Sequence, residues 1–181
     1  MRAVVTDPGS AGNVRHDERP APVPGRGEAL VRVTAISLNR GELRLAGRGE
    51  AGRPVGWDVA GVVEQAPSGT ERLSEGTRVV GFVKGSDGWA EKVAVPAADL
   101  ARIPDSVADL QADPLPVAGL TALYALERGR RLLGSRVLVT GATGGVGLFA
   151  VRLADLMGAR PVAQVRREEQ RELVRVEGAE A

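Results

Sequence analysis

The chain has 181 residues, of which 43% are hydrophobic and 26% charged, and its formal net charge is +1. The nearly neutral charge argues against nucleic acid or an anionic membrane as a partner. The absence of cysteine excludes disulfides, thiolate metal sites and a cysteine nucleophile. No apolar run approaches the ~18 residues of a membrane span, and Met1–Val5 is too short for a signal peptide. We therefore expect a cytoplasmic protein.

Residues 1–110 are predicted to form a small β-barrel domain. Short apolar segments separated by glycine and proline turns are typical of such a barrel; here they are Ala29–Ile36, Val59–Val63, Arg78–Val83 and Ala90–Val95. A short helix is predicted over Asn39–Leu45. His16, the one histidine, lies in a polar run and has no other ligand type beside it, which predicts a solvated surface side chain.

Residues 111–181 are predicted to begin a doubly wound α/β domain. Helical spacing of apolar residues marks Ala118–Arg128, where Tyr124 is expected in the core. Strands and helices then alternate, which indicates a parallel sheet; they are Arg136–Thr140, Gly145–Met157, Arg160–Val165 and Glu168–Val176. A complete domain of this kind needs roughly 100–150 residues. The chain is therefore expected to be a fragment or a truncated product; the alternative is a compact domain that ends at residue 181.

A glycine-rich loop between the predicted strand and helix of this domain carries the strongest functional signal. Residues 137–147 read Val-Leu-Val-Thr-Gly-Ala-Thr-Gly-Gly-Val-Gly. Glycine lets backbone N–H groups approach a pyrophosphate, and the helix N-terminus favours negative charge. The predicted cofactor-binding residues of the loop are Ala142, Thr143, Gly144, Gly145, Val146 and Gly147, with Ala142, Gly144 and Gly147 at the template glycines. The alternative is a glycine turn that binds nothing.

The end of the second strand predicts which nicotinamide cofactor is preferred. Enzymes that use NAD usually place an acidic residue here for the ribose 2′-hydroxyl, whereas this chain has Val165 followed by Arg166 and Arg167. A guanidinium binds a 2′-phosphate in a bidentate manner. We therefore predict NADPH, with Arg166 and Arg167 as ligands; the alternative is that both arginines are merely solvated.

The order of these parts resembles the medium-chain dehydrogenase/reductase superfamily, in which a GroES-like β-barrel precedes a Rossmann domain. The resemblance covers essentially the whole chain and is carried by Gly56–Val63, Gly76–Gly81, Gly88–Glu91, Leu115–Ala122 and Gly144–Gly147. The last of these is similar to the cofactor loop of the quinone oxidoreductase branch. The resemblance implies a two-domain fold that ends within the first half of the Rossmann domain, a small-molecule substrate and, as the expectation for this family, a homodimer.

Asn39, Trp57 and Val117 stand where this superfamily has its catalytic zinc ligands, and none offers a thiolate or imidazole. The resemblance therefore implies the zinc-independent branch, with no metal and with hydride passed to a quinone or an α,β-unsaturated carbonyl. It gives Asn39 the role of hydrogen-bond donor to the developing oxyanion and Thr121 that of a cofactor contact. The alternatives are that Asn39 caps a helix and that Thr121 is an interior helix residue.

Two further points limit the mechanism. Arg44 stands where some quinone reductases have a tyrosine, which leaves water as the proton source. Trp57 and Trp89 are candidates either for the core or for a substrate pocket. The alternative function is that of a catalytically inactive relative which serves as a binding or structural module.

Overall fold

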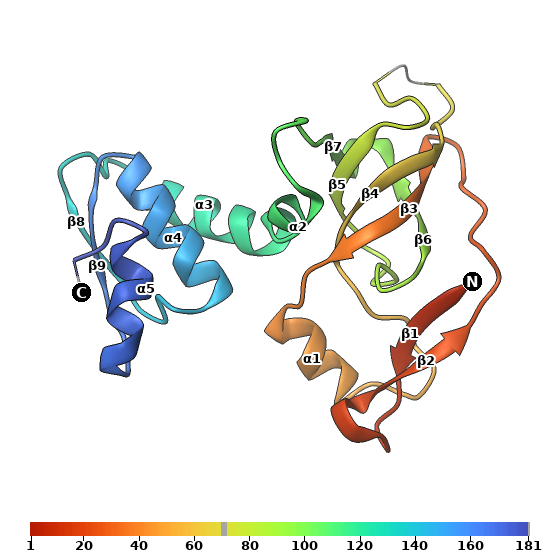
Figure 1. Cartoon of the computed structure of the whole chain (residues 1–181), viewed down its shortest axis with the longest axis horizontal. Helices are drawn as coiled ribbons and strands as arrows, with labels where there is room; N and C mark the ends of the chain where they lie inside the picture. The colour runs from red at the N-terminus through yellow and green to blue at the C-terminus, as the bar shows by residue number, and fades with distance from the viewer. Residues whose placement is uncertain (70–71, 181) are drawn as a thin grey trace. The chain divides into compact units, whose positions relative to one another are not determined.

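The computed structural model describes residues 1–69 and 72–180 and divides into two compact units, Met1–Val117 and Ala118–Ala181 (Figure 1). The sequence-based division falls after residue 110, close to the short helix α2, Asp109–Ala112. Within the described ranges, no helix has the length and apolar character needed to cross a lipid bilayer.

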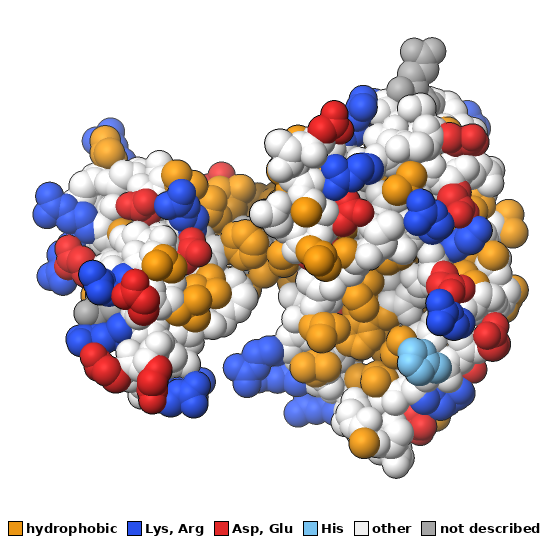
Figure 2. All heavy atoms as spheres, viewed as in Figure 1, with side chains coloured by type: hydrophobic (Ala, Val, Ile, Leu, Met, Phe, Trp, Pro, Cys, Tyr) orange, Lys and Arg blue, Asp and Glu red, His pale blue; other side chains and the backbone are white. Residues whose placement is uncertain are grey.

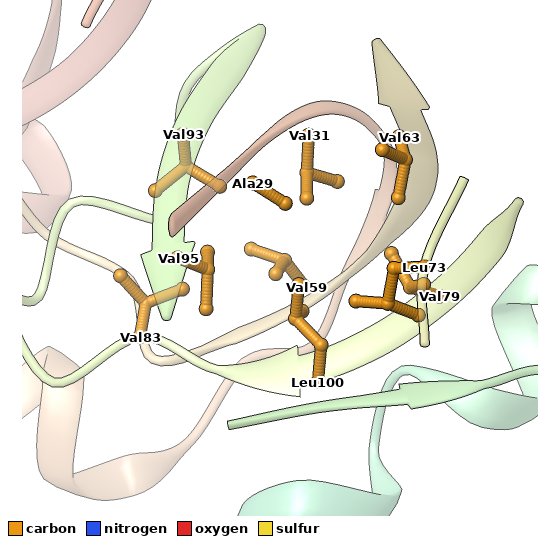
Figure 3. Packing of buried hydrophobic residues seen from close by; sticks show 10 residues of the cluster. All are labelled: Ala29, Val31, Val59, Val63, Leu73, Val79, Val83, Val93, Val95 and Leu100. Carbon is orange, nitrogen blue, oxygen red and sulfur yellow. The ribbon is translucent and has the colours of Figure 1, made fainter. Parts of the chain in front are cut away.

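The centre of the first unit is a five-stranded antiparallel sheet. Its strands, in spatial order, are β6 (Lys92–Pro96), β3 (Glu28–Ile36), β4 (Asp58–Gln65), β5 (Arg78–Phe82) and β7 (Leu100–Arg102). Alternate residues of β3 and β6 are buried, which gives each of these strands one core face, whereas the first four residues of β4 are all buried. Figure 3 shows these side chains converging on a common core with Val59 near its centre. The four predicted strands are thus present, with boundaries shifted by no more than two residues.

A separate antiparallel pair, β1 (Arg2–Thr6) and β2 (Val14–Glu18), completes the strands of this unit. Neither this pair nor β7 was predicted. In β2 the sequence Val-Arg-His-Asp-Glu lacks the apolar alternation of a half-buried strand. His16 lies in β2 and is exposed, as expected. The short predicted helix is α1, Arg40–Ala46.

The second unit contains two parallel strands, β8 (Arg136–Val139) and β9 (Arg160–Ala163). Its α-helices are α3 (Leu120–Glu127), α4 (Gly145–Leu156) and α5 (Arg171–Arg175). Val139, Ala142, Val151 and Val174 belong to its core. The order strand, helix, strand, helix agrees with the prediction, and Glu180 adds a parallel bridge to Val162 beyond α5.

The expectation that Tyr124 lies in the core is wrong, since its side chain is 58% exposed. The buried residues of α3 are Ala122 and Leu126, one turn apart on the same face. Tyr124 lies halfway between them in sequence, which at 3.6 residues per turn places it on the opposite face.

Candidate functional site

The glycine-rich loop lies in the second unit, between the end of β8 and the start of α4. Gly141 has φ +64°, a conformation that favours glycine, and Ala142 is fully buried behind it. A Cβ on Gly147 would lie 2.2 Å from the carbonyl oxygen of Gly141, so only glycine fits at this point of α4. The tight turn and the close packing of helix and loop both follow from these residues.

The loop leaves room for an anion at the N-terminus of α4. Gly144 is the N-cap residue, and a Cβ placed on it would meet only the Gly141 carbonyl oxygen, at 3.4 Å. The first amides of α4, those of Gly145, Val146 and Gly147, have no acceptor within the helix. These amides and the helix dipole favour a phosphate group at this position, so the cradle fits a dinucleotide.

Two arginines follow β9, and both are exposed. The backbone N–H of Arg166 donates to the side-chain oxygen of Gln170 at 3.2 Å. In residues 1–69 and 72–180 neither guanidinium has an ion-pair partner, whereas the nearby Arg171 pairs with Glu168 at 2.9 Å. Arg166 and Arg167 are therefore free to meet an anionic ligand. Thr121, on α3, is also exposed, contrary to the alternative of an interior residue.

In the first unit, Asn39 is the N-cap residue of α1 and its side chain contacts a buried carboxylate. Its Nδ2 donates to Oδ2 of Asp58 at 2.8 Å. Asp58 is fully buried and also accepts hydrogen bonds from Ser37 Oγ at 2.5 Å and from the Val117 backbone N–H at 3.0 Å. Burial raises the pKa of Asp58, and the hydrogen bonds from these three donors offset part of that rise.

A second buried carboxylate, Glu42, ties Asn39 to Trp57. Its Oε2 accepts the backbone N–H of Asn39 and its Oε1 accepts that of Trp57, each at 2.6 Å. Burial raises the pKa of Glu42, and these hydrogen bonds act in the opposite direction. Glu42 therefore holds the start of α1 against the segment that precedes β4.

A third buried carboxylate, Asp113, follows α2. It is 4% exposed, and within the described ranges its side chain has no hydrogen-bond or ion-pair partner. Burial raises its pKa to about 6, with further contributions from the negative charges of Asp58 and Asp109. Sequence reasoning missed Glu42 and Asp113 because burial, which makes a carboxylate unusual, has no local sequence signal.

The three side chains in the positions of zinc ligands do not fit a zinc ion. Asn39 already donates to Asp58, Trp57 donates Nε1–H to Ser86 Oγ at 2.8 Å, and Val117 is aliphatic. Across the part of the chain that the structure describes, no group of three or more His, Cys, Asp or Glu side chains is arranged to hold a metal.

The chain is similar to several known proteins. The family model of the alcohol dehydrogenase GroES-like domain matches residues 25–105 of this chain. The chain is 35% identical over 175 residues to the chloroplastic quinone oxidoreductase QR1 of Triphysaria versicolor, a match that covers 86% of this chain and 53% of the relative. It therefore spans about half the length of that protein.

Two further proteins are similar over nearly the whole chain. A mycocerosic acid synthase-like polyketide synthase of Mycobacterium tuberculosis is 35% identical over 186 residues, covering 99% of this chain but 9% of that much longer protein. A mycobacterial protein solved in complex with NADPH superposes with a TM-score of 0.86 at 29% identity, over 100% of this chain and 58% of its own.

Proposed function

The chain belongs to the medium-chain dehydrogenase/reductase superfamily, in its quinone oxidoreductase-like branch, and on this premise we propose a zinc-independent, NADPH-dependent reductase. Its acceptor is a quinone or an α,β-unsaturated carbonyl compound. The single observation that carries the proposal is the cradle between β8 and α4. There Gly144 leaves open space in front of the first amides of the helix, and Gly147 allows the helix to pack on the loop.

The residues of this chain have distinct tasks in the proposal. The amides of Gly145–Gly147 bind the pyrophosphate, and Arg166 and Arg167 bind the 2′-phosphate. When bound, NADPH supplies a hydride, which together with one proton from water reduces a quinone to the hydroquinone. Asn39 has one side-chain N–H beyond the one donated to Asp58, and this second N–H stabilises the negative charge that develops on the acceptor oxygen.

The side chains of Asn39, Trp57 and Val117, which do not suit zinc, support a conjugated acceptor. Without a Lewis acid, an isolated carbonyl is poorly polarised, whereas a quinone or enone spreads the incoming charge by conjugation. The similarity to a chloroplastic quinone oxidoreductase supports the quinone. The chain is also similar, over 99% of its length, to part of a polyketide synthase, and an α,β-unsaturated carbonyl compound, such as an enoyl thioester, is the second candidate acceptor.

The test is oxidation of NADPH by the intact protein, followed at 340 nm with a quinone, an enoyl thioester or a simple ketone as acceptor. We expect turnover with the first or second acceptor, none with the ketone, and no loss of rate after treatment with a chelator. Stoichiometric zinc in the active protein would contradict the metal-free mechanism. Binding of NADPH without turnover of any acceptor would instead favour an inactive binding module.

A further inference from the structure

The first unit contains a pocket of about 490 Å³ next to α1, within the usual range of ligand-binding pockets. Its lining residues come from β1, α1, the segment before β4 and the turn after β5; they include Thr6, Glu42, Leu45, Val55, Trp57 and Ser86. Figure 2 shows apolar side chains gathered on the surface around α1, where Leu43 and Leu45 are exposed. The pocket lies wholly within this unit.

The indole of Trp57 forms a fixed wall of the pocket. A Cβ on Gly41 would lie 2.7 Å from two of its ring carbons, so the indole packs directly on α1 where the side chain of residue 41 is absent. On its other edge, Nε1 donates to Ser86 Oγ at 2.8 Å. The Trp57 backbone N–H is held by Glu42. Contacts at these three points hold the ring in one orientation, so this wall of the pocket is preformed.

The principal polar groups that line the pocket already have partners. Both oxygens of Glu42 accept backbone N–H groups. Thr6 Oγ1 donates to the carbonyl of Glu50 and accepts the backbone N–H of Arg53, and the guanidinium of Arg53 pairs with Glu50 at 2.6 Å. An occupant therefore gains chiefly apolar contacts here, together with the face of the indole.

The pocket is also coupled to the proposed donor Asn39. One carboxylate, that of Glu42, accepts the main-chain N–H groups of both Asn39 and Trp57, so the backbone at Asn39 is tied to the backbone at Trp57. An acceptor bound against Trp57 would therefore also contact α1, the helix that Asn39 precedes as its N-cap residue.

From this geometry we infer that the pocket binds the ring system of a planar, apolar acceptor stacked on Trp57, and that Trp57 determines specificity for ring compounds over linear chains. The inference rests on the proposed function and narrows its substrate class to quinones. Offset stacking of aromatic rings contributes about 0.5–1.5 kcal/mol beyond the burial of area, which corresponds to about a 2- to 12-fold change in affinity. A linear enoyl chain has no ring to stack and gains none of this.

The two tryptophans of the chain provide a direct test that needs no turnover. Trp89 is 6% exposed and lies outside this pocket, so the variants Trp89→Phe and Trp57→Phe each report on one site. With 1,4-naphthoquinone and no cofactor, we expect saturable quenching of fluorescence in Trp89→Phe and none in Trp57→Phe. Equal quenching in both variants, or quenching confined to Trp57→Phe, would overturn the inference. So would the absence of saturable quenching in a folded Trp89→Phe protein.

Kinetics provide the second test. Trp57→Leu is expected to raise KM for naphthoquinone about 2- to 12-fold while KM for an acyclic enone and kcat for both change less than twofold. Trp57→Phe, which keeps a ring, should restore most of the affinity, and Trp89→Phe is the matched control. An equal change for both acceptors would show a merely structural role. If the protein reduces quinones but Trp57 fluorescence is not quenched, the proposed pocket is wrong and the proposed function is retained. If Trp57 fluorescence is quenched but NADPH is not oxidised, the proposed function is wrong and the pocket is retained.

Discussion

The carboxamide nitrogen of Asn39 lies 2.8 Å from Oδ2 of Asp58, a carboxylate with no exposed surface. Asp58 thereby holds one N–H of the Asn39 carboxamide in place. An asparagine in this position has one N–H engaged and one remaining, so the buried charge orients the side chain that we propose to meet the acceptor.

Replacing Asp58 with alanine is expected to destabilise the first unit. The change removes the acceptor for Ser37, Asn39 and Val117, and hydrogen bonds to a charged group each contribute about 1.5–3 kcal/mol, offset by the cost of burying the charge. We expect the free energy of unfolding in urea to fall by on the order of 2–4 kcal/mol. Glu50→Ala is the control, because this exposed partner of Arg53 should cost less than about 1 kcal/mol. Equal losses in the two variants would contradict the role of Asp58.

Asp113 makes the stability of the fold depend on pH. Its folded-state pKa of about 6 lies above the value of about 3.9 in an unfolded chain, so the native state holds the proton more tightly. The resulting stabilisation is complete below about pH 4, declines as the pH rises and is lost above about pH 6. Its size is at most about 3 kcal/mol, since one pKa unit corresponds to about 1.4 kcal/mol.

Asp113→Asn, which does not titrate, isolates this contribution from those of Asp58 and Glu42. We expect the unfolding free energy of the variant to fall less steeply than that of the parent protein between pH 4 and pH 7. The measurement is a series of urea titrations across this range. Parallel curves for the two proteins would show that the Asp113 carboxyl titrates normally.

The glycines of the cofactor loop are expected to respond differently to the same added methyl group. Gly147→Ala would place a Cβ 2.2 Å from the Gly141 carbonyl oxygen and should cost about 1–3 kcal/mol of stability. Gly144→Ala has 3.4 Å of clearance and a β-region backbone, so its stability should change by less than about 0.5 kcal/mol. Its methyl group nevertheless occupies the space where the pyrophosphate approaches.

Thermal denaturation and titration with NADPH separate the two effects. Gly144→Ala should melt like the parent protein and bind NADPH at least tenfold more weakly. A Gly144→Ala protein that binds NADPH normally would show that the dinucleotide does not use this cradle.

Regular elements with strong patterns were predictable from sequence. Strand β3 alternates apolar and polar residues, and α4 begins immediately after a glycine turn, so local pattern alone locates both. The β1–β2 pair was missed because β2 is polar on both faces and owes its pairing to β1. Tyr124 was misplaced because α3 buries only a narrow face, whose position depends on what packs against it.

The candidate site also has parts that the sequence predicts and parts that only the fold reveals. The glycine loop and the two arginines are contiguous in sequence, and their local chemistry indicates phosphate binding. The network of Asp58 and Glu42 joins residues 37–42 to residues 57–58 and 117, which are far apart in sequence and are brought together by the pairing of β3 with β4 and by the fold around it. Sequence analysis singled out Asn39 and Trp57 individually, while the carboxylates that position them required the fold.

The preference for NADPH over NADH is expected to depend on the positive charges of two arginines. Replacing both Arg166 and Arg167 with alanine removes two exposed guanidiniums that have no ion-pair partner in the described parts of the chain. A hydrogen bond to a charged group contributes about 1.5–3 kcal/mol, so the ratio of NADPH to NADH affinity should fall about 10- to 100-fold, mainly through weaker NADPH binding.

Arg171→Ala, which breaks only the exposed pair with Glu168, should leave the ratio within twofold of the parent value. Calorimetric titration with both cofactors measures each ratio, and raising the ionic strength should weaken NADPH binding more in the parent protein than in the double variant. If the double variant keeps the parent ratio, the 2′-phosphate is bound elsewhere and the two arginines are solvated residues at the start of the helical segment.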